Sequence, residues 1–284
     1  FFDKIATFSS FGVEVLNAYN YPSHFINHII DDDIKVDETR QELRKLHGIS
    51  NKDFVCLMVA RNTDTTDRKG YISQLLAFAM FKKTKKNCKL LMHENSSYSL
   101  DGGVNIEDFA NKLNIKDDII LTSEEGIKGI DYIYGLYKLA DVLLCASKSE
   151  GFGIPMVEAQ FMDLPVISTN CTSMSENTYY GICTEPHAIS TVINGINSWS
   201  NPSAVNIKAA LEIIYNNNLG NCNHNVTPID KTKYSSEVVM EDWIEFLDID
   251  YDGTQLFTEH LGKLFEVVKN RPIRNIKCVE DCKY

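Results

Sequence analysis

The sequence predicts an α/β fold built on a doubly wound parallel sheet. Short apolar runs follow one another along the chain without the polar alternation of a half-exposed strand, and the stretches between them carry apolar residues at helical spacing. Strands that are apolar throughout are typical of parallel sheets buried on both faces. Their alternation with helices predicts βαβ units with helices on both sides of the sheet. The 284 residues are 44% hydrophobic, which is enough for a substantial core.

Six strands are expected in this sheet, at residues 54–60, 89–93, 118–122, 141–146, 165–168 and 181–184. The helix after the first strand is indicated by one apolar face, made of Ile72, Leu75, Leu76, Ala79 and Met80. Further helices are expected at residues 106–113, 130–139 and 155–162. The sheet and its helices predict a domain over about residues 48–200.

Helical and strand patterns also flank this sheet. Before it, a strand, a helix, a strand and an acidic linker are expected at residues 5–9, 13–19, 25–30 and 31–38. After it, helices are expected at residues 205–215, 237–247 and 255–268. We therefore divide the chain into the end of an N-terminal domain with its linker (1–38), a ligand-binding C-terminal domain (39–235) and C-terminal helices (236–284).

Composition and charge disfavour several classes of partner. With 39 acidic and 28 basic side chains the net charge is −11, which argues against nucleic acid and against an anionic membrane surface. The sequence has no run of 18 apolar residues and no recognisable signal peptide, so no transmembrane segment is expected. The eight cysteines are scattered, several within apolar runs, as reduced thiols are, and they show no zinc-ligand pattern. The expected location is the cytoplasm.

The segment at residues 139–158, LADVLLCASKSEGFGIPMVE, carries the clearest sign of chemistry. A strand runs into a serine-rich turn, then Gly151 and Gly153, and Pro155 stands at the expected start of a helix. The glycines allow the backbone to approach a ligand, and free amides at Ile154, Met156 and Val157 would attract an anion. Such a site would lie at the carboxyl ends of the strands, where open α/β sheets bind ligands.

Two carboxylates flank this turn, Glu150 and Glu158. Carboxylates are poor partners for phosphate but good acceptors for sugar and ribose hydroxyl groups. Each also has a plainer interpretation, because Glu158 could be a charge favoured by the helix dipole and Glu150 a loop residue. Within the whole segment the ligand-binding interpretation is favoured.

The segment resembles the donor-site motif of retaining glycosyltransferases of the GT-B fold, in particular glycosyltransferase family 4. That motif reads alanine-aspartate, an apolar strand, a serine and then E-G-F-G-x-P-x-x-E-A, and it is matched by Glu150, Gly151, Phe152, Gly153, Pro155, Glu158 and Ala159. The resemblance implies that Glu150 contacts the transferred sugar and Glu158 the ribose of the nucleotide. It also implies donor contacts from Gly151, Phe152, Gly153, Ile154, Pro155, Met156 and Val157.

A second match lies upstream, where the family has a strand ending in Gly-Arg, a loop, and Lys-Gly at the start of a helix. Here Ala60 replaces the glycine before Arg61, the loop at 62–67 is longer, and Arg68 precedes Lys69. The resemblance implies that an arginine and Lys69 hold the donor diphosphate; Arg61 is the expected arginine and Arg68 the alternative. Two solvated basic side chains are the competing interpretation. His93, at the end of a strand, either contacts the donor or makes an ordinary hydrogen bond.

The implied reaction transfers a hexose from a nucleotide diphosphate sugar to an acceptor hydroxyl with retention. The donor is GDP- or UDP-linked, with mannose from GDP-mannose expected ahead of UDP-glucose, and the acceptor could be a glycan, a protein or a lipid. No Asp-x-Asp is suitably placed, so no metal and no further cofactor is expected. The alternatives are a non-catalytic nucleotide-sugar-binding module and another GT-B enzyme, such as a nucleotide-sugar epimerase. Two Rossmann-like domains need roughly 350–400 residues, so we expect a whole donor domain after the end of a truncated N-terminal Rossmann-like domain.

Overall fold

The computed structural model describes residues 4–94, 102–122, 129–192, 197–216 and 228–247. The chain forms two units, Phe1–Val239 and Met240–Tyr284. The helix expected at 255–268 and three of the cysteines lie outside the described residues.

The first unit is organised around a six-stranded parallel sheet. Its strands, in spatial order, are β5 (Ile119–Leu121), β4 (Cys88–His93), β3 (Phe54–Val59), β6 (Val142–Cys145), β7 (Val166–Thr169) and β8 (Gly181–Thr184). The order runs outward from β3 in one direction and outward from β6 in the other, so the direction of winding reverses between these two strands. The prediction of a doubly wound parallel sheet is confirmed, and the reversal marks where such sheets bind ligands.

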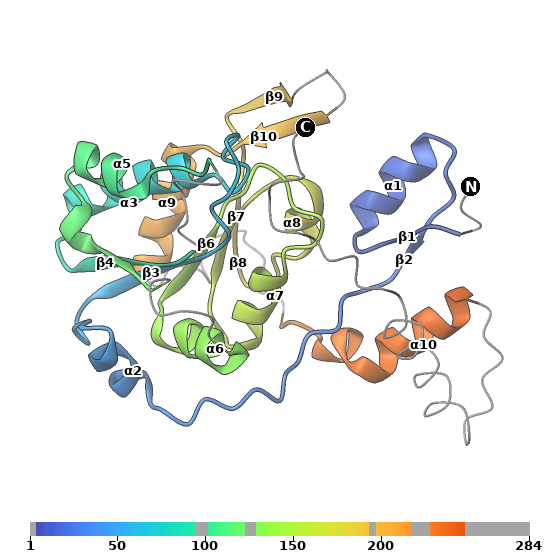
Figure 1. The fold of residues 1–284 in the computed structure, drawn as a ribbon, viewed down its shortest axis with the longest axis horizontal. Helices are drawn as coiled ribbons and strands as arrows, with labels where there is room; N and C mark the ends of the chain where they lie inside the picture. The colour runs from blue at the N-terminus through green and yellow to red at the C-terminus, as the bar shows by residue number, and fades with distance from the viewer. Residues whose placement is uncertain (1–3, 95–101, 123–128, 193–196, 217–227, 248–284) are drawn as a thin grey trace, which may run out of the picture. The chain divides into compact units, whose positions relative to one another are not determined.

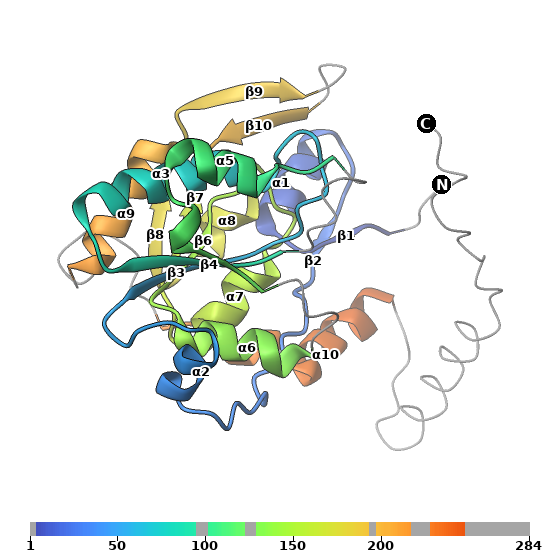
Figure 2. The ribbon, with the colours of Figure 1, turned by 60° about the vertical axis from the view of Figure 1, so that its left-hand side comes forward.

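Helices cover both faces of this sheet (Figures 1 and 2). One face carries α3 (Tyr71–Thr84), α5 (Ile106–Leu113) and α9 (Ala204–Tyr215); the other carries α2 (Arg40–Leu46), α6 (Ile130–Leu139) and α7 (Ile154–Phe161). The first core contains Leu75, Phe78 and Leu211 and the second contains Leu57, Leu143 and Ala159, all of them buried. Burial on both faces explains why the strands lack polar alternation.

Three elements beside the sheet were not expected from the sequence. The short helix α8 (Thr172–Glu176) follows β7, and the strands β9 (Ala188–Val192) and β10 (Asn197–Asn201) form a separate antiparallel pair, seen beyond the main sheet in Figure 2. The helix α2 was also unexpected. Its sequence, RQELRKL, offers too few apolar positions for a helical pattern.

The two N-terminal strands are shorter than their patterns, and the helix between them begins earlier than expected. The strands β1 (Ala6–Thr7) and β2 (His24–Phe25) pair in parallel around α1 (Ser10–Ala18). The helix begins earlier than the apolar pattern indicates, because the Ser9 side chain accepts a hydrogen bond from the Gly12 amide and caps it. After the sheet, a short 3₁₀ helix, η5 (Lys231–Tyr234), precedes α10 (Ser236–Leu247).

Candidate functional site

Lys69 is held beside the end of β6 by the residue that follows it. Gly70 has a φ of +68°, and a Cβ there would lie 2.3 Å from the Ala146 carbonyl oxygen, so any larger residue would push the loop away. The buried Gln74 side chain then bridges the two segments, donating to the Lys69 carbonyl (2.8 Å) and accepting from the Ala146 amide (3.1 Å). The start of α3 and the carboxyl end of β6 are thereby locked together.

The Glu150 carboxylate contacts two cations and one hydroxyl group near the carboxyl end of β6. Lys69 Nζ lies 2.6 Å from one carboxylate oxygen, to which Ser147 Oγ also donates (2.6 Å), and Arg68 lies 3.2 Å from the other. The Glu150 side chain is only 8% exposed. Burial alone would raise the pKa of Glu150, but Lys69, Ser147 and Arg68 together lower it below its ordinary value. Glu150 is therefore an ionised acceptor and not a proton donor at neutral pH.

The main chain of Glu150 is held by α8. Its amide donates to Thr172 Oγ1 (3.2 Å) and its carbonyl accepts from Ser173 Oγ (3.0 Å). The unexpected short helix thus fixes the loop that carries the candidate sugar-binding carboxylate.

The long loop at 62–67 has its own internal support. Asp64 accepts from the Thr66 and Arg68 amides (3.1 and 3.0 Å), and Asp67 accepts from the Tyr71 and Ile72 amides at the start of α3 (2.6 and 3.2 Å). The departure from the family pattern is therefore an ordered turn that delivers Arg68 and Lys69 to the carboxyl edge of the sheet.

The start of α7 differs in detail from the expectation. The helix begins at Ile154, so Pro155 is its second residue and Glu158 lies beyond its first turn. The expectation of a free amide at Met156 is wrong, because Gly153 has a φ of +89° and its carbonyl accepts from that amide at 2.9 Å. No heavy atom lies within 4 Å of a Cβ built on Gly151, so the space in front of the turn is open among the described residues.

Glu158 has a different environment from Glu150. Tyr137 on α6 donates its hydroxyl to Glu158 at 2.7 Å. Burial raises the pKa of Glu158, and the hydrogen bond from Tyr137 only partly opposes this effect. The two carboxylates of the motif therefore have pKa values shifted in opposite directions.

Three other predicted site residues that the structure describes, Arg61, His93 and Phe152, form no hydrogen bond or ion pair with the Glu150 carboxylate. Arg61 is exposed, and the hydrogen bonds within the described ranges include none from its guanidinium group. His93 ends β4 and shares a hydrogen bond with Thr122 Oγ1 (2.8 Å). Phe152 is buried, with its ring packed edge-on against His28 and Tyr234. The structure thus brings Arg68, Lys69 and Glu150 into contact, and donor contacts by Arg61, His93 and Phe152 stay predictions.

Four contributors to this site were missed in the sequence: Ser147, Tyr137, Thr172 and Ser173. Ser147 matches the serine of the family motif, and its position three residues before Glu150 could have signalled a contact. Thr172 and Ser173 lie on another segment of the chain, and only the sheet order brings them to Glu150. No local sequence pattern could have indicated that Thr172 and Ser173 contact Glu150.

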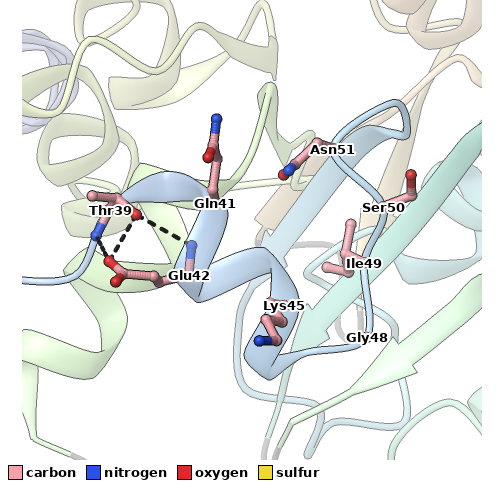
Figure 3. A pocket seen from close by; sticks show the side chains of 8 residues that line it. All are labelled: Thr39, Gln41, Glu42, Lys45, Gly48, Ile49, Ser50 and Asn51. Atoms are coloured by element: carbon pink, nitrogen blue, oxygen red, sulfur yellow. Dashed lines mark hydrogen bonds between the residues drawn. The ribbon is translucent and has the colours of Figure 1, made fainter.

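A hollow of about 730 Å³ lies elsewhere, along α2 and the turn before β3. Figure 3 shows its lining, with Thr39 and Glu42 joined in the capping box that begins α2 and Lys45 beyond them. It precedes the amino end of β3, whereas Lys69 and Glu150 lie beyond the carboxyl ends of the strands. The hollow therefore plays no part in the candidate site.

The described residues contain no candidate metal site and no candidate membrane span. In these parts of the chain no group of three His, Cys, Asp or Glu side chains could hold a metal ion. Among the described helices, none is long and apolar enough to cross a membrane.

Comparison with solved structures identifies the fold as GT-B. The chain is similar to sucrose-phosphate synthase from Thermosynechococcus elongatus (16% identity, TM-score 0.62, covering 94% of this chain and 58% of that one). It is also similar to a glycosyltransferase from Rickettsia africae (19%, 0.65, 87% and 64%). A third similar structure is Anabaena HepE in complex with UDP and glucose (14%, 0.67, 88% and 64%). At these identities the likeness shows the fold, and the chain spans about three fifths of those proteins.

Sequence comparison gives the family. No curated protein matches the chain. Residues 39–217, more than half of its length, match the family described as Glycosyl transferases group 1. The chain therefore belongs to the group 1 glycosyl transferases.

Proposed function

We propose that this chain carries the donor half of a retaining glycosyltransferase of family 4, which transfers a hexose from a nucleotide diphosphate sugar to an acceptor hydroxyl. The observation that carries the proposal is the contact of Lys69 and Arg68 with Glu150 beside the start of α7. It places cations, an ionised acceptor and an open glycine turn at one edge of the sheet. These are the groups needed to hold a diphosphate and a sugar together.

The proposed chemistry follows from the charges. When the sugar leaves, negative charge grows on the diphosphate and positive charge on the anomeric carbon. Lys69, the proposed diphosphate arginine and the positive end of α7 stabilise the negative charge on the diphosphate. The ionised Glu150 stabilises the positive charge on the anomeric carbon. Because Lys69 is paired with Glu150 and its backbone is held by Gly70 and Gln74, its charge needs no rearrangement when the diphosphate departs.

The stereochemical outcome, the metal and the roles of single residues are also proposals. We propose retention by front-face attack assisted by the leaving phosphate, without a metal or other cofactor. Arg61, or Arg68 in its place, and Lys69 hold the diphosphate. Glu150 binds the sugar and Glu158 binds the ribose.

Two donors are proposed, in order of preference. GDP-mannose is tested first and UDP-glucose second, the latter supported by the UDP and glucose present in the Anabaena HepE structure. The acceptor, whether glycan, protein or lipid, is proposed to bind to the N-terminal domain, whose end is residues 1–38. Residues 39–235 form the proposed donor domain and residues 236–284 its C-terminal helices.

We place the reaction in the cytoplasm. Within the described residues, Cys56, Cys88, Cys145, Cys171 and Cys183 are free thiols. Burial raises the pKa of the Cys88 thiol to about 11 and that of the Cys145 thiol to about 12. Unreactive free thiols suit a reducing compartment.

Donor turnover tests the proposal. Hydrolysis and transfer are measured with GDP-mannose and UDP-glucose for the wild type, Glu150→Gln and Lys69→Ala. We expect both variants to lose roughly 100- to 1,000-fold in kcat, the range for removing one group that stabilises developing charge. Lys89→Ala is the matched control, because Lys89 also pairs with a partly buried carboxylate, Asp118, but near the amino end of β4.

Two outcomes would contradict the proposal. Equal background turnover in the wild type and both variants would remove the catalytic assignment, and retained nucleotide binding would then favour the non-catalytic module. A loss of turnover in Lys89→Ala as large as in Lys69→Ala would show that the assay reports stability instead of catalysis.

A further inference from the structure

Lys148 joins three segments of the chain around the candidate site. Its amide donates to the Arg68 carbonyl (2.8 Å) and its carbonyl accepts from the Ser200 amide on β10 (3.2 Å). Its side-chain Nζ donates to the Thr66 carbonyl (2.7 Å) and lies 6.0 Å from the centre of the Trp199 ring. One residue thus contacts the loop before α3, the loop before α7 and the hairpin β9–β10.

These contacts constrain the partners of Glu150. Lys148 contacts the carbonyls of Arg68, which immediately precedes Lys69, and of Thr66, three residues before Lys69. From the other side, the Arg68 side chain donates to the Ser149 carbonyl (2.8 Å), next to Glu150. The two loops are therefore joined residue by residue, and the separation of Lys69 Nζ from the Glu150 carboxylate depends on that junction.

The side-chain bond of Lys148 is partly buried. A charge-assisted bond to a carbonyl is stronger when water is excluded from it. Trp199 lies over the ammonium group as an aromatic face that attracts a cation. This also gives the hairpin β9–β10, which has no strand in the main sheet, a mechanical connection to the site.

We propose that Lys148, secured by Trp199, is a positioning residue that fixes the loop carrying Lys69 against the loop carrying Glu150. The proposal rests on the proposed function, since the fixed distance matters for transfer of a sugar. Lys148 makes no contact with the reacting atoms in this role. It acts through the Thr66 carbonyl, and a displacement of about 1 Å in a positioned group can cost roughly 100-fold in rate.

The test compares four full-length proteins: wild type, Lys148→Met, Lys148→Arg and Lys89→Met. Methionine keeps an unbranched side chain but removes the donor and the charge, whereas arginine keeps both. Lys89→Met is the matched control, because Lys89 also donates to a main-chain carbonyl, that of Asp117 (2.9 Å), away from the site. Amide hydrogen exchange of peptides covering residues 61–70 and 147–151 is measured beside kcat and KM for GDP-mannose and UDP-glucose.

We expect Lys148→Met to exchange both peptides about tenfold faster and to lose roughly 30-fold in kcat with KM within about threefold. Lys148→Arg should restore both readouts to near the wild-type values, and Lys89→Met should change neither. Unchanged exchange, or faster exchange with unchanged kcat, would overturn the positioning role. A wild type without turnover on either donor would instead contradict the proposed function, and the exchange difference would still decide whether Lys148 fixes the loops.

Discussion

Two clusters, each with one negative and two positive side chains, lie at the amino and carboxyl ends of the sheet's strands. In the amino-edge cluster, Asp141 before β6 lies between Arg40 (2.5 Å) and Arg44 (2.7 Å). In the carboxyl-edge cluster, Glu150 after β6 lies between Lys69 and Arg68. Each therefore has one carboxylate and two cations, but only the second is proposed to bind a ligand.

In the amino-edge cluster the buried arginine has its donors occupied by the fold, whereas Arg40 is 44% exposed and, within the described residues, donates to Asp141 alone. Arg44 is almost fully buried and donates to the carbonyls of four residues besides the Asp141 carboxylate: Leu139, Ser50, Asn51 and Asp53. The same Asp141 oxygen accepts from the Val55 amide (2.7 Å). Such a cluster ties α2, β3 and β6 together and has a structural role.

The carboxyl-edge cluster is incompletely satisfied. An ammonium group has three donors, and within the described residues Lys69 Nζ donates to Glu150 alone. The turn at Gly151 in front of it is open. The comparison teaches that the inner cations of the two clusters, Arg44 and Lys69, differ in the donors left over and not in their charge.

Among the changes that distinguish the two clusters, Asp141→Asn is expected to lower the unfolding free energy the most. This change leaves the buried Arg44 charge without its carboxylate, and removing one partner of a buried pair costs about 3 kcal/mol of unfolding free energy. Nucleotide affinity should stay as in the wild type, because the cluster holds no ligand. Urea unfolding and calorimetric titration with GDP and UDP measure the two quantities. A loss of nucleotide affinity without a loss of stability would show that the amino-edge cluster binds the ligand and has no structural role.

Glu150→Gln is expected to change stability and anion affinity in opposite directions. Lys69 and Arg68 lose their carboxylate, which lowers the unfolding free energy by roughly 1–3 kcal/mol. The freed cations should attract pyrophosphate more strongly by about 1 kcal/mol, or roughly fivefold in Kd. The exposed Glu107, which pairs with Lys116, provides the control Glu107→Gln. Weaker pyrophosphate binding in Glu150→Gln would contradict a cationic site.

The pH dependence of stability gives a smaller effect. Burial alone would raise the pKa of Glu150, and Lys69 is the strongest of the groups that lower it. A carboxyl group with a lowered pKa stabilises the fold above its ordinary pKa of 4.5, and this contribution is lost as the pH falls through the folded-state value. In Lys69→Met the pKa of Glu150 rises, so acid destabilisation should begin at a higher pH.

Unfolding free energies from about pH 8 down to about pH 3 measure this shift. Lys112→Met is the control, because Lys112 pairs with Asp108 on the exposed face of α5. Parallel stability curves for the wild type and Lys69→Met would show that Lys69 does not hold Glu150 ionised.

The parts of the fold that follow from local periodicity could be predicted from the sequence. The helices α5 and α6 have the predicted bounds, and the six strands agree within one or two residues. The helix α2 could not be predicted, because the Thr39–Glu42 capping box and the Arg44–Asp141 ion pair stabilise it instead of an apolar face. That ion pair joins residues 97 positions apart.

The candidate site was predicted where a local motif carries it. Glu150 and Lys69 were both named, but their contact depends on β3 and β6 being neighbours in the sheet. Whether Arg61 or Arg68 accompanies Lys69 could not be decided, since the Asp64 and Asp67 turn determines where each side chain points. The occupied Met156 amide depends on the backbone at Gly153, which the motif does not reveal.

The smallest effect on stability is expected for the arginine that this turn leaves exposed. Arg61→Ala should leave the unfolding free energy within about 0.5 kcal/mol of the wild type, whereas Arg68→Ala, which removes contacts with Glu150 and Ser149, should lower it by about 1 kcal/mol. If Arg61 holds the diphosphate, Arg61→Ala still weakens GDP and UDP binding about fivefold, roughly 1 kcal/mol, since its charge is not used by the fold. Titration calorimetry on both variants separates the two roles. Weaker binding confined to Arg68→Ala would assign the diphosphate to Arg68, and the donor site would then share its arginine with the ion pair that holds Glu150.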